Sequence, residues 1–298
     1  MSQRLDTTLK DSHDMKVFGL GTLASMANRE RYVRFTSALY GVYSTMEQEL
    51  DKCCEVANAA DTIQEGKVGD DDGLSKSKSP VAHFWNKHST ILRRAPMLKK
   101  DVEDASKMMN TGNEKIHELA KYDDSKYTSA TIDYMNAIRE AGEEDRKRGT
   151  GRLLGHAYTR YLADLMGGSV LGTPTRMALR LGEGMPTQYS FAFPASSSSS
   201  SAGDSSSDNA SEENNSNDVA MSRKEYVESI YSDLNEAGEI LKKENTDGAD
   251  DDGALLEEVV AEAREAFRHN VKVYAEEPIY FDSAVGLKNI AIGWVMRK

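Results

Sequence analysis

Hydrophobic residues recur at intervals of three and four along most of this chain, and this helical period restricts the fold more than any other feature. The clearest run lies in residues 30–50, where the apolar side chains share one face of a helix. Similar periods occur at residues 80–105, where Pro96 starts or breaks a helix, and at residues 131–142, 153–171, 223–241 and 255–274. Alternation typical of strands is confined to residues 189–193. The sequence therefore predicts an all-α fold.

Three polar segments interrupt this pattern, near residues 60–80, 195–221 and 245–253. The second is almost entirely Ser, Asn, Asp, Glu and Gly. Such segments cannot bury enough apolar surface to offset their ordering entropy, so we predict mobile surface insertions. The rest of residues 1–277 is predicted to form one helical domain. Residues 278–298 form a C-terminal tail without a motif, which packs either as a strand-like arm or as a helix.

Charge and cysteine content exclude several classes of protein. Lys and Arg total 37 against 49 Asp and Glu, a formal net charge of −12, so no nucleic-acid partner is expected. The chain has two cysteines, Cys53 and Cys54, and their adjacency excludes a disulfide framework or a CxxC zinc site. Two reduced thiols in a reducing compartment are the expectation.

No run reaches the roughly 20 apolar residues that a membrane-spanning helix needs, so no membrane span is expected. The N-terminus has neither an apolar h-region nor the composition of a transit peptide. We therefore predict a soluble monomer that is cytoplasmic as written, or located in a plastid if a leader has been removed from a longer precursor.

The most informative segment is LLGHAYTRYLADLMGGSVL, residues 153–171. Adjacent glycines are costly within a helix, at about 1 kcal/mol each, so Gly167 and Gly168 indicate a kink or a close approach of the backbone to a flat ligand. Arg160 and Asp164 are four residues apart and share a helix face. The alternative interpretation is a core helix with an exposed ion pair worth only about 0.3–0.5 kcal/mol.

Within this segment, HAYTRYLADLMGG closely resembles the distal-helix signature of the haem oxygenases. Weaker similarities to the same family follow in the same order along the chain. They lie at residues 39–51, 92–105, 126–142, 190–194, 226–235 and 263–277. The resemblance therefore covers the chain from about residue 5 to residue 277, with interruptions at the predicted insertions.

The resemblance implies an all-helical protein that holds haem between a proximal and a distal helix. It implies oxidative cleavage of haem to biliverdin, carbon monoxide and ferrous iron, with O2 as oxidant and haem as both substrate and cofactor. Electrons would come from an external donor, either ferredoxin or an NADPH-dependent reductase. Two alternatives remain: a haem or bilin carrier of the same fold that has lost turnover, and a haem-free helical interaction protein.

The resemblance also assigns roles to individual residues. His13 matches the iron ligand of the proximal helix, and a neutral imidazole is a suitable ligand for haem iron. Asp164 matches the catalytic carboxylate that orders water beside iron-bound oxygen. The other residues that match the catalytic network are Arg160, Tyr43, Tyr127 and Asn270. The residues implied to contact haem are Lys10, Tyr158, Ala163, Gly167 and Gly168.

The chain departs from the family pattern at a few positions. Ala163 stands where glycine is usual, directly before Asp164, and Met166 replaces a small polar residue. Basic residues that clamp the haem propionates are replaced at three positions, by Asp6, Val227 and Tyr231. Each lost charge-assisted contact is worth about 1.5–3 kcal/mol, so we expect weaker or reoriented haem binding.

Overall fold

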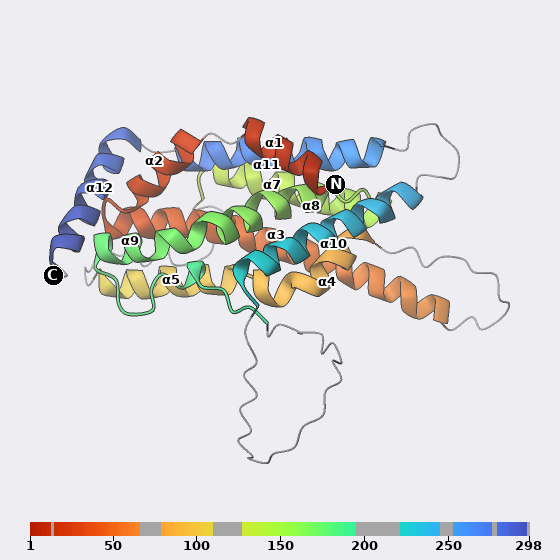
Figure 1. Ribbon diagram of the computed structural model, residues 1–298, viewed down its shortest axis with the longest axis horizontal. Helices are drawn as coiled ribbons and strands as arrows, with labels where there is room; N and C mark the ends of the chain where they lie inside the picture. Colours follow the sequence, from red (N-terminus) through yellow and green to blue (C-terminus); the bar gives the residue numbers. More distant parts are fainter. Residues whose placement is uncertain are drawn as a thin grey trace, which may run out of the picture.

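Long helices account for most of the chain, and Figure 1 shows several of them lying along the long axis of the molecule. The computed structural model describes residues 1–12, 15–65, 79–109, 127–194, 221–244, 253–275 and 279–296. These residues contain no β-strand, so the predicted all-α fold is confirmed. The elements are α1 (Ser2–Ser12), α2 (Met15–Ser25), α3 (Arg29–Glu65), α4 (Pro80–Leu92), α5 (Ala95–Met108), α7 (Ser129–Arg148), α8 (Arg152–Ala157), η2 (Tyr158–Leu162), η3 (Asp164–Gly168), α9 (Ser169–Leu179), η4 (Thr187–Tyr189), α10 (Arg223–Glu244), α11 (Ala254–Ala275) and α12 (Ile279–Met296).

The predicted insertions fall mostly outside the described residues, which leave out 66–78, 195–220 and 245–252. The first insertion begins later than predicted, because residues 60–65 continue α3. The run at residues 189–193 follows the short 3₁₀ turn η4 and forms no strand.

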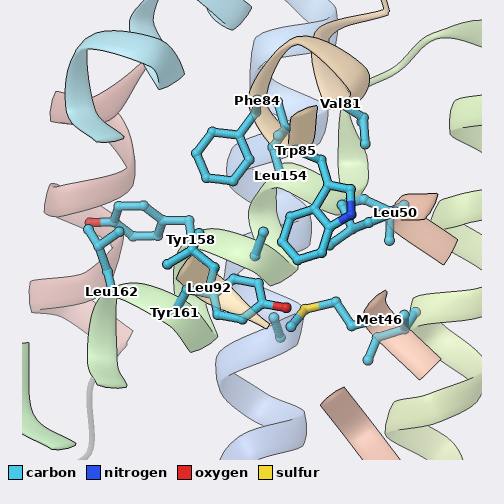
Figure 2. Packing of buried hydrophobic residues seen from close by; sticks show 14 of the residues in the cluster. Met46, Leu50, Val81, Phe84, Trp85, Leu92, Leu154, Tyr158, Tyr161 and Leu162 are labelled. Atoms are coloured by element: carbon cyan, nitrogen blue, oxygen red, sulfur yellow. The ribbon is translucent and has the colours of Figure 1, made fainter. Parts of the chain in front are cut away.

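The long helix α3 is central to the bundle and packs against α4, α5 and α7. Its predicted apolar stripe is buried, with Met46 and Leu50 fully shielded from solvent. Trp85 of α4 stacks on Tyr161, with ring centroids 5.7 Å apart, and Figure 2 shows these side chains in one apolar cluster. Burying a side chain such as Leu or Met stabilises a fold by about 1.5–3 kcal/mol. This cluster therefore fixes α3 against the segment that contains the distal motif.

Pro96 lies in the first turn of α5. Of the two predicted alternatives, that it starts a helix or breaks one, the first is therefore correct. Glu47 of α3 accepts the backbone N–H groups of Arg94 and Ala95, at 2.6 and 3.0 Å, and so caps this helix start. The same geometry buries Arg94, which donates to the carbonyl oxygen of Ser190 at 2.6 Å. A cation is thereby held inside the bundle.

The C-terminal segment takes the helical alternative, and α12 packs against α2 and α9 (Figure 1). Two glycines allow this contact. A Cβ atom at Gly293 would lie 2.7 Å from the carbonyl oxygen of Met177, and one at Gly286 would overlap the backbone of Leu23. Within the described ranges, no helix combines the length and the apolar character that crossing a bilayer requires.

Candidate functional site

A cavity of about 460 Å³ opens between α2, α3, α11 and the segment that follows α8. Sites for small molecules commonly span about 300–1,000 Å³ and carry few polar groups on mostly apolar walls. Phe18, Leu39 and Phe267 contribute apolar wall here, and the polar groups include Tyr43 and Asp164. Size and lining are therefore those of a ligand site.

One wall of the cavity is a helix wound as two π-helical pieces, η2 and η3. π turns are rare and occur frequently at functional sites. The helix approaches α11 closely just before this point, since a Cβ atom at Gly155 would lie 2.7 Å from the carbonyl oxygen of Val259. The sequence predicted a kink or a close backbone approach at the glycine pair. The structure has a widened helical turn that ends at Gly168.

The two adjacent glycines line the cavity in different ways. A Cβ atom added at Gly167 would meet no atom within 4 Å. One added at Gly168 would lie 3.1 Å from Cδ1 of Tyr189, which is tighter than ordinary contact. Gly168 therefore leaves room for a neighbouring ring, whereas Gly167 leaves open space at the cavity.

Asp164 is the acidic group of the cavity, and among the described residues its hydrogen-bond partner is Tyr43, whose hydroxyl donates to Oδ2. Burial raises the pKa of Asp164, and the charge of Arg160 and the Tyr43 hydrogen bond oppose this only in part. Burial also raises the pKa of Tyr43 well above its ordinary value, so the phenol keeps its proton and acts as the donor.

Arg160 is buried beside this pair and is held from two sides. Its Nη1 donates to Oδ1 of Asn270 at 2.9 Å, and its guanidinium lies 4.9 Å from the centre of the Tyr43 ring. Burial alone lowers the pKa of Arg160, but the phenols of Tyr43 and Tyr274 and the carboxyl of Asp164 raise it well above its ordinary value. Arg160 forms no ion pair with Asp164 among the described residues, so the alternative of an exposed ion pair is wrong.

The structure brings most of the predicted site together. The predicted residues that line the cavity are Tyr43, Arg160, Ala163, Asp164, Gly167, Gly168 and Asn270. Tyr127 is not among the lining residues; its ring lies against Gly41, where a Cβ atom would be 2.9 Å from the ring. His13 and the side chain of Lys10 lie outside the described part of the structure.

Tyr158 also lies off the cavity lining, because its side chain points to another cluster. Its hydroxyl donates to Oδ1 of Asp6 at 2.5 Å, and the hydroxyl of Tyr231 donates to the same oxygen at 3.0 Å. Burial raises the pKa of Tyr231 to about 12, so this phenol also keeps its proton. Asp6 therefore joins α1 to η2 and α10 through two tyrosines, where the family resemblance led us to look for basic residues.

Sequence reasoning missed several lining residues, among them Arg94, Tyr189 and Tyr274. Tyr274 packs edge-on against Phe18 and Phe35, with ring centroids 5.0 and 4.9 Å away. Tyr189 and Tyr274 lie beside or within stretches that resemble the family. No spacing rule distinguished them from core aromatics, because their role depends on contacts between distant segments.

Comparisons with known proteins agree with this fold. Residues 83–200 match the family model described as Heme oxygenase. A haem oxygenase of Takifugu rubripes is 27% identical over 200 residues, which cover 66% of this chain and 58% of that protein. The chain thus spans little more than half the length of this relative.

Solved structures show the same fold. Haem oxygenase 2 of Chlamydomonas reinhardtii, solved without haem, superposes with a TM-score of 0.59 at 16% identity, over 93% of this chain and 97% of that one. Haem oxygenase-2 of Synechocystis sp. PCC 6803, in complex with haem and NO, superposes with a TM-score of 0.58 at 19% identity, over 98% and 90%. The fold is thus a helical bundle of the haem oxygenase type. In sequence, this chain is similar to haem oxygenases, in agreement with the resemblance of its distal-helix motif.

Proposed function

We propose that this protein is a haem oxygenase, which cleaves haem to biliverdin, carbon monoxide and ferrous iron with O2 and electrons from ferredoxin or an NADPH-dependent reductase. The observation that carries this proposal is the hydrogen bonding of the two carboxylate oxygens of Asp164. Its Oδ2 is bonded to Tyr43, and its Oδ1 accepts no hydrogen bond from the described residues, although it belongs to a cavity wall. A carboxylate held in this way is able to order water.

The residues present fit haem, which is a flat and largely apolar ring system that bears carboxylates. Apolar walls, a volume suited to a small molecule and the open space at Gly167 provide for the ring. The described residues supply one buried cation on the cavity wall besides Arg160, namely Arg94, which is already bonded to backbone carbonyls. Arg94 is thus occupied by the protein, whereas Arg160 donates from Nη1 to Asn270 and has no partner at Nε.

When bound, haem supplies the iron that activates O2 and the ring carbon that is oxidised. The protein's own part is to position a proton donor. Tyr43 fixes the orientation of Asp164, and Asn270 fixes Arg160 beside them. Asp164 is then able to hold a water through Oδ1 and to pass protons through that water. The open space beside Gly167 would let its backbone approach the ring of a bound haem.

For the iron ligand we propose His13, with Lys10 one turn before it in the sequence as a contact to a haem carboxylate. In the sequence, His13 lies two residues before the start of α2 at Met15. The helix α2 lines the cavity through Phe18, Gly19 and Thr22. The replacement His13→Ala should change the ferric haem spectrum. An unaltered spectrum would show that another residue binds the iron.

A second candidate function, a haem or bilin carrier without turnover, is favoured by two observations. Asp6 occupies the centre of a tyrosine cluster and leaves a carboxylate where a basic clamp is usual in the family. The methyl group of Ala163 lines the cavity directly before Asp164. If that methyl displaces the ordered water, Ala163→Gly should speed haem cleavage, and a slower variant would contradict this steric argument.

A haemin titration followed by turnover distinguishes these functions. Haemin added to the purified protein should shift the Soret band, and ascorbate or reduced ferredoxin in air should then produce the absorbance of biliverdin. A Soret shift without biliverdin supports the carrier. No Soret shift contradicts both functions and leaves a haem-free interaction protein.

A further inference from the structure

A cluster of ionisable side chains lies between α4 and α10, apart from the residues that line the cavity. His83 and Lys87 are four residues apart on α4, and Asp233 and Glu236 are three residues apart on α10. Each pair therefore shares one face of its helix, and the two helices pack against each other. The haem chemistry proposed above uses none of these four residues.

Three of these side chains present atoms that divalent metals bind. The ligand atoms of His83, Asp233 and Glu236 lie within 4.8 Å of one another, and Nε2 of His83 is 2.9 Å from Oε2 of Glu236. Zinc binds imidazole nitrogen and carboxylate oxygen at about 2.0–2.2 Å, so atoms on one ion stand up to about 4 Å apart. Small side-chain adjustments therefore bring all three atoms onto one ion.

A cation already occupies the point where these atoms converge. The ammonium of Lys87 donates to Oδ1 of Asp233 and, at 3.1 Å, to Oε2 of Glu236. It also lies 3.3 Å from Nε2 of His83. The Lys87 side chain is 43% exposed and flexible, and exposed ion pairs contribute little to stability. This ammonium can therefore turn into solvent and leave its place to a more strongly bound cation.

Asp233 is held in position from the interior of the bundle. Its other oxygen, Oδ2, lies 2.8 Å from Nε2 of His88, which is buried. A carboxylate at Nε2 favours the tautomer with its proton there, so Nδ1 of His88 accepts from the Tyr226 hydroxyl, 3.1 Å away. Outer hydrogen bonds of this kind orient the ligands of metal sites. The oxygen that faces Lys87 is thus fixed before any ion arrives.

We propose that His83, Asp233 and Glu236 bind one divalent transition-metal ion of the class that Zn²⁺ represents. The ion takes the place of the Lys87 ammonium. An imidazole among the ligands favours this class over Ca²⁺ and Mg²⁺, which prefer oxygen ligands, and three protein ligands leave a position for water. The ion joins α4 to α10, the helices that precede and follow the polar segment of residues 195–220.

Calorimetric titration of the full chain without haem, with ZnCl2 as the probe, tests the site. His83→Ala should weaken binding at least about 100-fold, since even outer contacts to metal ligands are worth about 10–100-fold. Glu236→Gln keeps the shape of the side chain and should weaken it in the same sense. Absence of binding, or binding that both variants leave unchanged, overturns the site.

Lys87→Met tests the displacement, because it keeps an unbranched side chain and removes the competing charge. Zn²⁺ affinity should rise about tenfold. The matched control is Lys100→Met, which breaks another exposed lysine–carboxylate pair, with Asp104, and should leave Zn²⁺ affinity unchanged. Equal affinity in Lys87→Met and the wild type overturns the displacement of Lys87.

Thermal unfolding measures the joining of the two helices. Zn²⁺ at about 100 times its Kd should raise the Tm of the wild type and leave that of His83→Ala unchanged, because an ion bound only by the folded state stabilises it. An unchanged Tm of the wild type contradicts the joining role.

Diffraction at the zinc absorption edge locates the ion. Crystals of the wild type with ZnCl2 should show an anomalous peak between α4 and α10, with the Lys87 side chain turned away from it. Peaks found only elsewhere on the chain overturn the site. The result does not depend on turnover: a chain that binds Zn²⁺ here without cleaving haem contradicts the proposed function alone, and one that cleaves haem without this peak contradicts the metal site alone.

Discussion

Two aspartates on either side of α8, Asp145 and Asp164, differ in how fully the protein satisfies their carboxylate oxygens. Asp145, near the end of α7, accepts from the backbone N–H groups of Arg152 and Leu153, both at 2.8 Å, and from the Thr150 hydroxyl. Asp164 accepts from Tyr43 alone among the described residues. Asp145 is saturated by the protein, and Asp164 keeps an oxygen for something else.

The two carboxyls also differ in the contacts that oppose the effect of burial on their pKa values. Burial raises the pKa of both carboxyls. At Asp145 the opposing contacts are hydrogen bonds from Thr150, Leu153 and Arg152, which belong to the turn that it stabilises. At Asp164 the main opposing contact is the charge of Arg160, which forms no bond with it. A saturated carboxylate fixes the backbone around it, whereas an unsaturated one at a cavity is available to water or ligand.

The largest expected effect is on turnover, in Asp164→Asn. An amide cannot act as a general acid or base, so biliverdin formation should fall about 100-fold or more. Haem affinity should stay within about threefold, since the side chain keeps its size. Single-turnover assays with ascorbate in air measure the rate, and a rate close to that of the wild type would remove Asp164 from the mechanism.

The matched change Asp145→Asn should act on stability instead. The amide cannot accept as well from two N–H groups and a hydroxyl, so the free energy of unfolding should fall by about 2 kcal/mol. Urea denaturation measures this. Turnover per folded molecule should remain that of the wild type, and a specific loss of turnover would blur the distinction between the two aspartates.

The two glycines of the cavity wall extend the comparison to backbone contacts. In Gly168→Ala the new methyl must displace the Tyr189 ring, which lines the cavity, so haem affinity should fall about tenfold. Gly167→Ala has open space around it and should raise the unfolding free energy of the haem-free protein by roughly 0.5–1 kcal/mol, as expected for Ala in place of helical Gly. Haemin titrations and urea denaturation of both variants test this order, and equal affinities would contradict it.

The smallest effect concerns Cys53 and Cys54, which are buried without a role in the site. Burial raises their pKa values to about 12 and about 11. The neutral thiol is therefore favoured in the folded state, and this contribution to stability is lost as pH rises from the unfolded value of about 8.5 through the native values. At pH 8, iodoacetamide should label the native thiols at least 100-fold more slowly than the unfolded ones, as mass spectrometry would show. Rapid labelling of the native protein would contradict this assignment.

Local sequence patterns were sufficient for much of the fold. The period of three and four in residues 30–50 predicted the buried face of α3, and Pro96 marked the start of α5. The end of α3 was missed, because residues 60–65 are too polar to show a buried stripe and continue a helix that is already formed. In the site, the motif residues Arg160 and Asp164 were found because one short segment carries both.

Other parts of the site depended on residues that the chain brings together from a distance. The contact of Tyr158 and Tyr231 with Asp6 joins three helices, and no spacing in the sequence indicates it. Tyr189 and Tyr274 both line the cavity, although one precedes and the other follows the long insertion in the sequence. In the sequence alone, each therefore has the pattern of an ordinary core aromatic residue. The π-helical winding could not be predicted from the hydrophobic period either, because that period assumes a regular α-helix.

The amino-acid sequence by itself determined that this protein is helical and singled out the short segment that lines the cavity, because both follow from residues near one another in the chain. Only the tertiary structure decided which polar groups are saturated and which remain available. That distinction depends on which donors the folded chain brings to each oxygen: Asp145 is reached by groups from the turn after α7, and Asp164 by one hydroxyl from α3.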